Sequence, residues 1–246
     1  MTDAHRSALV LGAAGGVGRA CAARLAADGY DVVALDLDGS VDRLPDCTAL
    51  VGDATDPAVL ARAFDACARP PSVLVHALLG EARAPLADLT AEQWHRVLNV
   101  SLVSAWQAAA ELVRRKGEGT ASIVLVGSVH AHGAAPGMAP YAVAKAGLGA
   151  LARAAAVEWG PLGVRTNVVE PGFVAVERNA HRWGDPAERR RIEAAYPLGR
   201  LCRPAEIAEA VAFLAGPSSS YVNGVALPVE GGALAYLPEV HVPRRP

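Results

Sequence analysis

The sequence predicts an α/β fold in which a doubly wound parallel sheet carries helices on both faces. Short apolar runs rich in β-branched residues alternate with longer alanine-rich stretches of helical period, and this alternation is typical of a parallel sheet. The strand candidates are continuously apolar, as expected when helices cover both faces of the sheet. Aromatic residues make up only 5% of the chain, so small side chains are expected to fill the space between helices and sheet.

The expected elements follow one another in chain order. The first strand, "ALVLG", leads through a glycine-rich turn into a helix that ends at "DGY", where Gly29 is a natural C-terminal stop. Apolar runs such as "DVVALD", "SVLVHA" and "SIVLVG" mark the later strands. We expect strands over residues 8–12, 31–36, 48–52, 72–77, 122–127, 165–170 and 224–229. Helical patterns lie between them over 16–28, 57–68, 90–115, 140–159 and 204–215.

Composition limits the class of protein. No repeat or linker divides residues 1–246, so we expect one domain, with an irregular, proline-containing arm over 233–246. A net charge of −2 gives no general attraction to nucleic acid or to an anionic membrane. The four cysteines form no CxxC pair, so neither a zinc site nor a disulfide framework is indicated. The sequence begins without a signal-peptide pattern, and we expect a cytoplasmic protein that does not enter the membrane.

The first strand–helix turn predicts a nucleotide site. Gly12, Gly16 and Gly18 lie in this turn, where glycine lets the backbone approach a pyrophosphate and the helix start supplies free N–H donors. Any tight strand–helix turn favours glycine, so the turn alone is weak evidence. The second strand adds to it, because it ends at Asp36, where a dinucleotide fold needs an acid for the adenosine ribose hydroxyls.

A second motif, "YAVAK", lies on the predicted helix 140–159. Tyr141 and Lys145 are four residues apart and share a helix face. A free tyrosine has a pKa of about 10 and is a poor base near neutral pH. We expect the Lys145 ammonium to lower the pKa of Tyr141 and to make it a proton donor and acceptor for alcohol–carbonyl chemistry. Taken alone, the pair also fits a buried tyrosine beside a lysine whose stem packs along the helix.

Together these motifs resemble the short-chain dehydrogenase/reductase family, from Ala8 to about Gly232. The matching segments are "GAAGGVG", "GDATD", "VLNVS", "LVGSVHA", "YAVAK", "EPGFV" and "VNGVALPVEGG". The resemblance implies a Rossmann-like fold with a sheet of about seven strands, a nicotinamide cofactor, and a homodimer or homotetramer.

The resemblance also assigns roles to residues. The catalytic residues would be Asn99, Ser128, Tyr141 and Lys145: Ser128 would hydrogen-bond the substrate oxygen, Lys145 would also hold the nicotinamide ribose, and Asn99 would position a water in a relay from Lys145. The cofactor contacts would be Gly12, Gly15, Gly16, Val17, Gly18, Asp36, Asp53, Ala54, His76, Tyr141, Lys145, Pro171, Gly172 and Val174.

Two segments depart from the family pattern. "VHALLG" stands where the family has an Asn-Asn-Ala-Gly element, so the loop near the adenosine ribose is expected to differ in shape. His76 lies in this segment and is also explained as a packing residue. Val176 replaces a threonine that often follows the Pro-Gly pair, which predicts one hydrogen bond fewer to the cofactor.

Substrate contacts are expected from Ser128, His130, Tyr141 and Trp183. The segment 173–203 is predicted to form a variable flap over the substrate, because loops carry specificity, and Trp183 lies within it. His130 and His132 have the spacing of a metal-binding pair, but the local sequence offers no third ligand, so we expect no metal.

The sequence therefore predicts an oxidoreductase that transfers a hydride between NAD(H) and a secondary alcohol or ketone. Asp36 favours NAD over NADP, because its carboxylate would repel a 2′-phosphate and no arginine or lysine stands beside it at Leu37 or Asp38. Two alternatives stay open: an NADPH-dependent ketoreductase of an acyl-thioester or polyketide, and a non-catalytic dinucleotide-binding protein. In each case the chain would be a homo-oligomer, a tetramer or a dimer, whose helices present small apolar faces to a partner copy.

Overall fold

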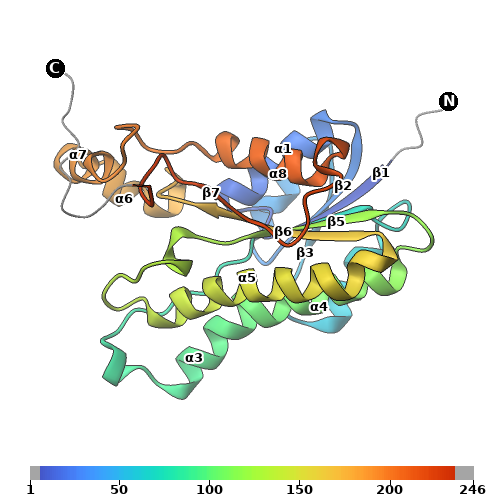
Figure 1. The fold of residues 1–246 in the computed structure, drawn as a ribbon, viewed down its shortest axis with the longest axis horizontal. Helices are drawn as coiled ribbons and strands as arrows, with labels where there is room; N and C mark the ends of the chain where they lie inside the picture. The colour runs from blue at the N-terminus through green and yellow to red at the C-terminus, as the bar shows by residue number, and fades with distance from the viewer. Residues whose placement is uncertain (1–5, 236–246) are drawn as a thin grey trace.

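A single parallel sheet of seven strands forms the centre of the molecule (Figure 1). The structure, a computed structural model, describes residues 6–235. The strands lie in the order β3-β2-β1-β4-β5-β6-β7, so the chain winds outward from β1 first in one direction and then in the other. This is the Rossmann-like doubly wound fold that the sequence predicts. The strands are β1 (Arg6–Leu11), β2 (Tyr30–Asp36), β3 (Cys47–Val51), β4 (Val73–His76), β5 (Ala121–Val126), β6 (Val164–Pro171) and β7 (Ala226–Val229).

Helices cover both faces of this sheet. The helices α1 (Gly16–Ala27) and α8 (Pro204–Ala215) pack on one face, where Leu25 and Ile207 join the apolar core. On the other face lie α2 (Pro57–Asp65), α4 (Ser104–Arg115) and α5 (Ala139–Trp159). Figure 1 shows α1 and α8 above the sheet and α4 and α5 below it. The continuous apolar strands are explained by this arrangement, because each strand is buried on both sides.

The helix expected over 90–115 is interrupted. It consists of α3 (Ala91–Leu98), a π-helical turn (Asn99–Val103) and α4. A π turn adds one residue per turn and is often found at functional sites. Here it turns Ser101 inward, where the buried Ser101 hydroxyl accepts a hydrogen bond of 2.8 Å from the backbone N–H of Gly80.

The predicted flap over 173–203 contains short helices between β6 and α8. They are a 3₁₀ turn (Glu177–Asn179), α6 (Ala180–Trp183) and α7 (Pro186–Ala194). The predicted C-terminal arm over 233–246 lies outside the described residues from 236 onward. Among residues 6–235, no helix combines the length and apolar composition that a membrane crossing requires.

Candidate active site

Three of the four predicted catalytic residues lie together beyond the carboxyl end of β5: Ser128, Tyr141 and Lys145. Ser128 follows the end of β5 by two residues and is 6% exposed. α5 begins at Ala139 with a proline in its first turn, a position where the missing proline N–H costs no helical hydrogen bond. This start places Tyr141 in the first turn of α5 and Lys145 one turn later.

Tyr141 is hydrogen-bonded to Ser128 and contacts His130. The two aromatic rings meet edge to face with their centroids 5.3 Å apart. Burial raises the pKa of Tyr141 above its usual value, and the hydrogen bond with Ser128 is the largest cause acting in the opposite direction. The expected lowering of this pKa by Lys145 is not found in the unliganded chain, because Lys145 is not among the causes of the shift. The Lys145 Nζ lies 5.7 Å from the centroid of the Tyr141 ring.

Lys145 is a buried cation whose pKa is strongly lowered. Its side chain is 2% exposed, and Nζ donates to the backbone carbonyls of Val126 (2.7 Å) and Leu78 (3.4 Å). Burial and the nearby Arg178 guanidinium lower the pKa of Lys145 to about 7. Within residues 6–235, no carboxylate forms an ion pair with it, so the charged form has only carbonyl dipoles for support. A buried donor in this state is suited to ligand hydroxyl groups that approach it from outside.

Asn99 is not part of this cluster. It lies in the π turn with its side chain exposed, and its role in a proton relay stays a prediction. Ser101, two residues further on, is the buried polar residue of the turn and holds the loop after β4 through Gly80. The regular helical period assumed for 90–115 could not reveal this, since the π turn changes which side chains point inward.

The glycine turn has the backbone geometry of a phosphate-binding loop. Gly12 has φ +82°, and a Cβ on Gly18 would lie 2.0 Å from the Gly12 carbonyl oxygen, so both positions require glycine. Gly15 is exposed at the N-cap of α1 and provides no side chain to satisfy the first N–H groups. Val17 follows in the first helical turn. These free donors and the open approach at Gly15 fit the pyrophosphate of a dinucleotide.

Asp36 faces the same turn. Its carboxylate accepts hydrogen bonds of 2.9 Å from the backbone N–H groups of Ala14 and Asp38. These bonds fix the two oxygens at the end of β2, and the lone pairs that remain can accept ribose hydroxyls. Asp53 and Ala54 follow β3, the neighbour of β2. Asp53 accepts from the backbone N–H and the hydroxyl of Thr55, and Ala54 is buried.

The end of β6 reaches the glycine turn through the start of the flap. A Cβ on Gly16 would lie 2.6 Å from the Val176 side chain, so the flap packs directly on this turn. An ion pair of 2.5 Å between Arg19 and Glu177 adds a second tie between α1 and the flap. The predicted nicotinamide segment, with Pro171, Gly172 and Val174, leads into this contact.

His76, predicted as a cofactor contact, is fully buried in the structure. The side chain is 0% exposed, and Nε2 lies 2.8 Å from the Ser104 hydroxyl, which itself donates to the Val100 carbonyl. Nε2 must therefore carry the proton, and Nδ1 is buried without a partner among the described residues. Burial lowers the pKa of His76 to about 3, with Lys145 as a smaller cause. Its side chain joins β4 to the π turn and offers no surface to a dinucleotide.

Trp183, a predicted substrate contact, lies in the flap, and His132 lies near the end of β6. The Trp183 indole N–H donates to the Val176 carbonyl (3.0 Å), so it holds the flap together. His132 forms a 2.6 Å contact with the buried carboxylate of Glu170. Over residues 6–235 no group of three or more metal-ligating side chains occurs.

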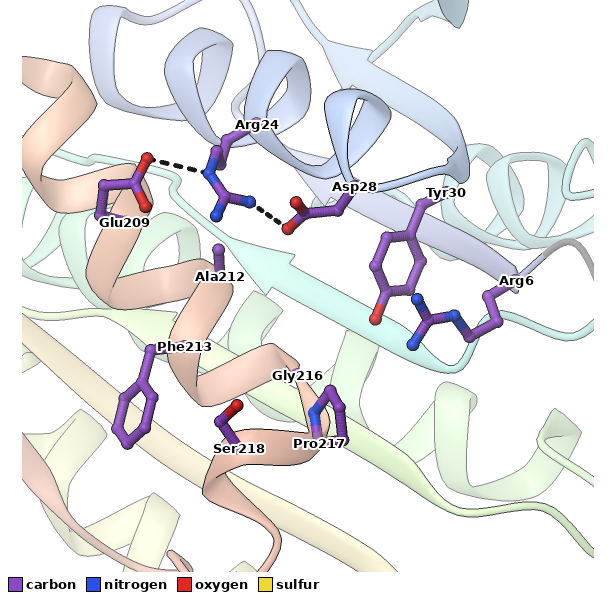
Figure 2. Close-up of a pocket in the computed structure, with 10 residues that line it drawn as sticks. All are labelled: Arg6, Arg24, Asp28, Tyr30, Glu209, Ala212, Phe213, Gly216, Pro217 and Ser218. Carbon is purple, nitrogen blue, oxygen red and sulfur yellow. Dashed lines mark hydrogen bonds and ion pairs between the residues drawn. The ribbon is translucent and has the colours of Figure 1, made fainter. Parts of the chain in front are cut away.

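A pocket away from these residues is shown in Figure 2. It has a volume of about 410 Å³ and opens between the starts of β1 and β2 and the end of α8. Arg24 crosses it, bound to Asp28 and Glu209, and Arg6 stacks 4.4 Å from the centre of the Tyr30 ring. This pocket holds none of the predicted catalytic residues, so the chemistry, and not the pocket size, identifies the candidate site.

Comparisons with known proteins cover nearly the whole chain. The family described as enoyl-(acyl carrier protein) reductase matches residues 12–233. Cis-4-hydroxycyclohexanecarboxylate dehydrogenase of Sinomonas cyclohexanicum is 35% identical, over 94% of this chain and 98% of its own length. Dehydrogenase/reductase SDR family member 4 of Bos taurus is 30% identical, over 95% of this chain and 88% of its own.

A solved structure shows the same fold. Gluconate 5-dehydrogenase from Burkholderia cenocepacia J2315, in complex with NADP and tartrate, has a TM-score of 0.86 and 28% identity, over 94% of this chain and 96% of its own. The family match, the relatives and the shared fold together establish that this chain belongs to the short-chain dehydrogenase/reductase family.

Proposed function

We propose that this family member is an NAD-dependent dehydrogenase that interconverts a secondary alcohol and its ketone. The observation that carries the proposal is the arrangement of Ser128, Tyr141 and Lys145. The phenol is hydrogen-bonded to the serine, and the lysine is buried one helical turn away with its Nζ 5.7 Å from the Tyr141 ring centroid. A proton donor, a hydrogen-bonding hydroxyl and a cation are thus gathered at one point beyond the sheet.

The chain's own residues would move the proton and hold the reacting oxygen. When bound, the nicotinamide ring supplies the hydride acceptor or donor. Tyr141 takes the proton of the alcohol in one direction and returns it in the other, and Ser128 hydrogen-bonds the oxygen as its charge changes. Burial opposes the phenolate, so the base form depends on positive charge nearby. Arg178 already lowers the pKa of Tyr141, and Lys145 adds its charge when it is protonated.

Asp36 supports NAD as the cofactor. Its oxygens are held at the end of β2 by two backbone N–H groups, and the residue that follows, Leu37, is exposed and uncharged. A 2′-phosphate would lie against this carboxylate, and Leu37 supplies no positive charge to offset the repulsion. Because the solved relative carries NADP, the assay has to compare NAD with NADP directly.

A ketoreductase acting on an acyl-thioester is the second candidate. It is favoured by the description of the matching family, an enoyl-(acyl carrier protein) reductase. The relative named for cis-4-hydroxycyclohexanecarboxylate favours the first candidate. The two candidates differ in their substrates. Comparing turnover of acetoacetyl-CoA with NADPH and of 4-hydroxycyclohexanecarboxylate with NAD separates them.

The decisive experiment follows nicotinamide absorbance with both cofactors and a panel of alcohols and ketones. Tyr141→Phe is expected to lower turnover by roughly 10²- to 10⁴-fold, the range of a general acid–base contribution, and to leave the cofactor Kd within about twofold, since only the phenolic oxygen is removed. Near-normal turnover by Tyr141→Phe would refute the acid–base role. Cofactor binding without turnover of any substrate would instead favour a non-catalytic dinucleotide-binding protein.

We also propose that the chain acts as a homo-oligomer, a tetramer or a dimer. The outer surfaces of α4 and α5 expose apolar side chains, among them Trp106 (50%), Val143 (48%) and Val157 (77%). Two long neighbouring helices with such a surface can pack against their symmetry copies across a two-fold axis.

A further inference from the structure

Three charged side chains form a cluster close to Tyr141, here called the Glu81 cluster: Glu81, Arg83 and Arg178. The carboxylate of Glu81 accepts from Arg178 Nη1 at 2.8 Å and from Arg83 Nε at 2.8 Å. Glu81 and Arg83 lie in the loop after β4, and Arg178 lies in the 3₁₀ turn of the flap. The cluster therefore joins two crossover segments that meet over the site.

The Glu81 cluster holds more positive than negative charge. Two guanidinium groups share one carboxylate, which leaves one positive charge without a counterion in the cluster. Glu81 is the better buried member, with 25% of its side chain exposed, whereas Arg83 and Arg178 are 65% and 60% exposed. A guanidinium has five N–H donors in a planar fork that matches a carboxylate. The cluster can thus accept a second carboxylate, which would balance two cations with two anions.

The position of the cluster relates this charge to the reaction. Arg178 lowers the pKa of Tyr141 and of Lys145, and Glu81 raises the pKa of Tyr141. Arg83 lowers the pKa of His130, whose ring packs edge to face against the ring of Tyr141. The loop that carries Glu81 and Arg83 also carries Leu78, whose carbonyl lies 3.4 Å from Lys145 Nζ, so this loop lies beside the proposed catalytic lysine.

We propose that Arg83 and Arg178 bind a carboxylate of the substrate, and that Glu81 holds these two arginines in place in the unliganded chain. The substrate class is then a hydroxy acid or the corresponding keto acid, with the reacting hydroxyl at Tyr141 and the carboxylate at the Glu81 cluster. This inference rests on the proposed function, because it assigns a specificity to the same site.

The first test compares an acid with its neutral analogue. The probes are 4-hydroxycyclohexanecarboxylate and the corresponding carboxamide, and the measured quantity is the ratio of their kcat/KM values. Arg83→Gln and Arg178→Gln should each lower kcat/KM for the acid by about 10-fold, the size of one charge-assisted hydrogen bond, and should lower the acid-to-amide ratio with it. Glu81→Gln should raise this ratio, because the amide oxygen can still accept from the arginines but no longer offsets their positive charge.

A matched control comes from the same flap. Arg189 lies on α7 and pairs with Glu193 of its own helix, so Arg189→Gln should leave the acid-to-amide ratio unchanged. Equal loss in Arg189→Gln and Arg178→Gln would show a general charge effect and overturn the inference. The ratio in wild type should also fall as salt is added, since the arginines are exposed.

A binding measurement separates this inference from the proposed function. Cyclohexanecarboxylate lacks the reacting hydroxyl, so its calorimetric titration with cofactor present needs no turnover. Binding that weakens about 10-fold in Arg178→Gln supports the anion site even if no alcohol is oxidised, which would refute the proposed function alone. Alcohol oxidation with equal affinity for cyclohexanecarboxylate and its amide would refute the anion site alone.

Discussion

Burial takes the Lys145 ammonium out of water and leaves backbone carbonyls as its hydrogen-bond acceptors. Its pKa of about 7 in the unliganded chain lies far below the ordinary 10.5. At about pH 8 the side chain is therefore mostly neutral, and at about pH 6 it is mostly protonated. The phosphates of a bound dinucleotide favour the charged form, so binding should raise this pKa.

We therefore expect cofactor binding to take up a proton at about pH 8 and to take up much less at about pH 6. Calorimetry in two buffers of different ionisation enthalpy measures this uptake. Lys145→Met should abolish it and weaken binding. Identical binding enthalpies in both buffers at about pH 8 would mean that Lys145 does not change its charge.

His76 makes the stability of the folded chain depend on pH. The folded chain keeps it neutral down to about pH 3, whereas the unfolded chain binds a proton near the ordinary value of 6.5. Stability is thus complete above the unfolded pKa and falls as the pH drops below it. The slope is about 1.4 kcal/mol per pH unit for one proton.

His76→Gln keeps an N–H donor near the position of Nε2 for Ser104 and removes the titrating group. Urea unfolding from about pH 6 to about pH 4 should show the wild type losing roughly 1 kcal/mol more per pH unit than this variant. Parallel pH profiles would contradict the assignment of the slope to His76.

At the scale of single residues, the sequence motifs correctly locate Ser128, Tyr141 and Lys145 next to one another and Asp36 at the end of β2. These residues occur in short motifs at the ends of strands or at a helix start, where local sequence decides the geometry. The sequence did not indicate that His76 is fully buried or that Asn99 is exposed. Both depend on which face of an element points inward, and burial decides this through contacts distant in the sequence, such as that between His76 and Ser104.

At the scale of elements, the π turn between α3 and α4 is the main departure from the expected helix. The apolar residues on each side of the π turn follow the ordinary helical period of 3.6 residues. The sequence pattern therefore does not reveal the extra residue in the π turn. The structure separates the two polar residues of the turn: Ser101 is buried and bonded to Gly80, and Asn99 is exposed.

This difference leads to a paired prediction. Ser101→Ala leaves the buried Gly80 N–H without an acceptor and should lower the free energy of unfolding by about 1–3 kcal/mol. It should also weaken cofactor binding, because the same loop carries the Leu78 carbonyl that receives Lys145. Asn99→Ala should change stability by less than about 0.5 kcal/mol and leave kcat within about twofold. A large loss of kcat in Asn99→Ala would instead support the relay role that the family resemblance implies.

At the scale of the whole molecule, the alternation of strands and helices was enough to predict the doubly wound sheet. The exact strand order needed the structure, because sequence period does not say which strands become neighbours. The exposed apolar surface of α4 and α5 is the feature that concerns assembly. Trp106 and Val157 lie on this surface, on different helices.

We expect light scattering at micromolar concentration to give a mass two or four times that of the single chain. Trp106→Glu combined with Val157→Glu should dissociate the oligomer, because charges buried at an interface without partners are strongly unfavourable. Phe213→Glu on α8 serves as a control for an exposed apolar residue on the other face of the sheet. A single-chain mass for the wild type would contradict the proposal.

The parallel direction of all seven strands has one more consequence. Every loop that follows a strand lies at the rim with Ser128, and every loop that precedes one lies at the opposite rim. The turn at Gly117 and Gly119, between α4 and β5, belongs to the second group, and side chains at either glycine would meet no neighbouring atom within 4 Å. Lineage-specific insertions, affinity tags or a fused reporter domain can therefore enter there without touching the chemistry, so the two rims are free to diverge independently.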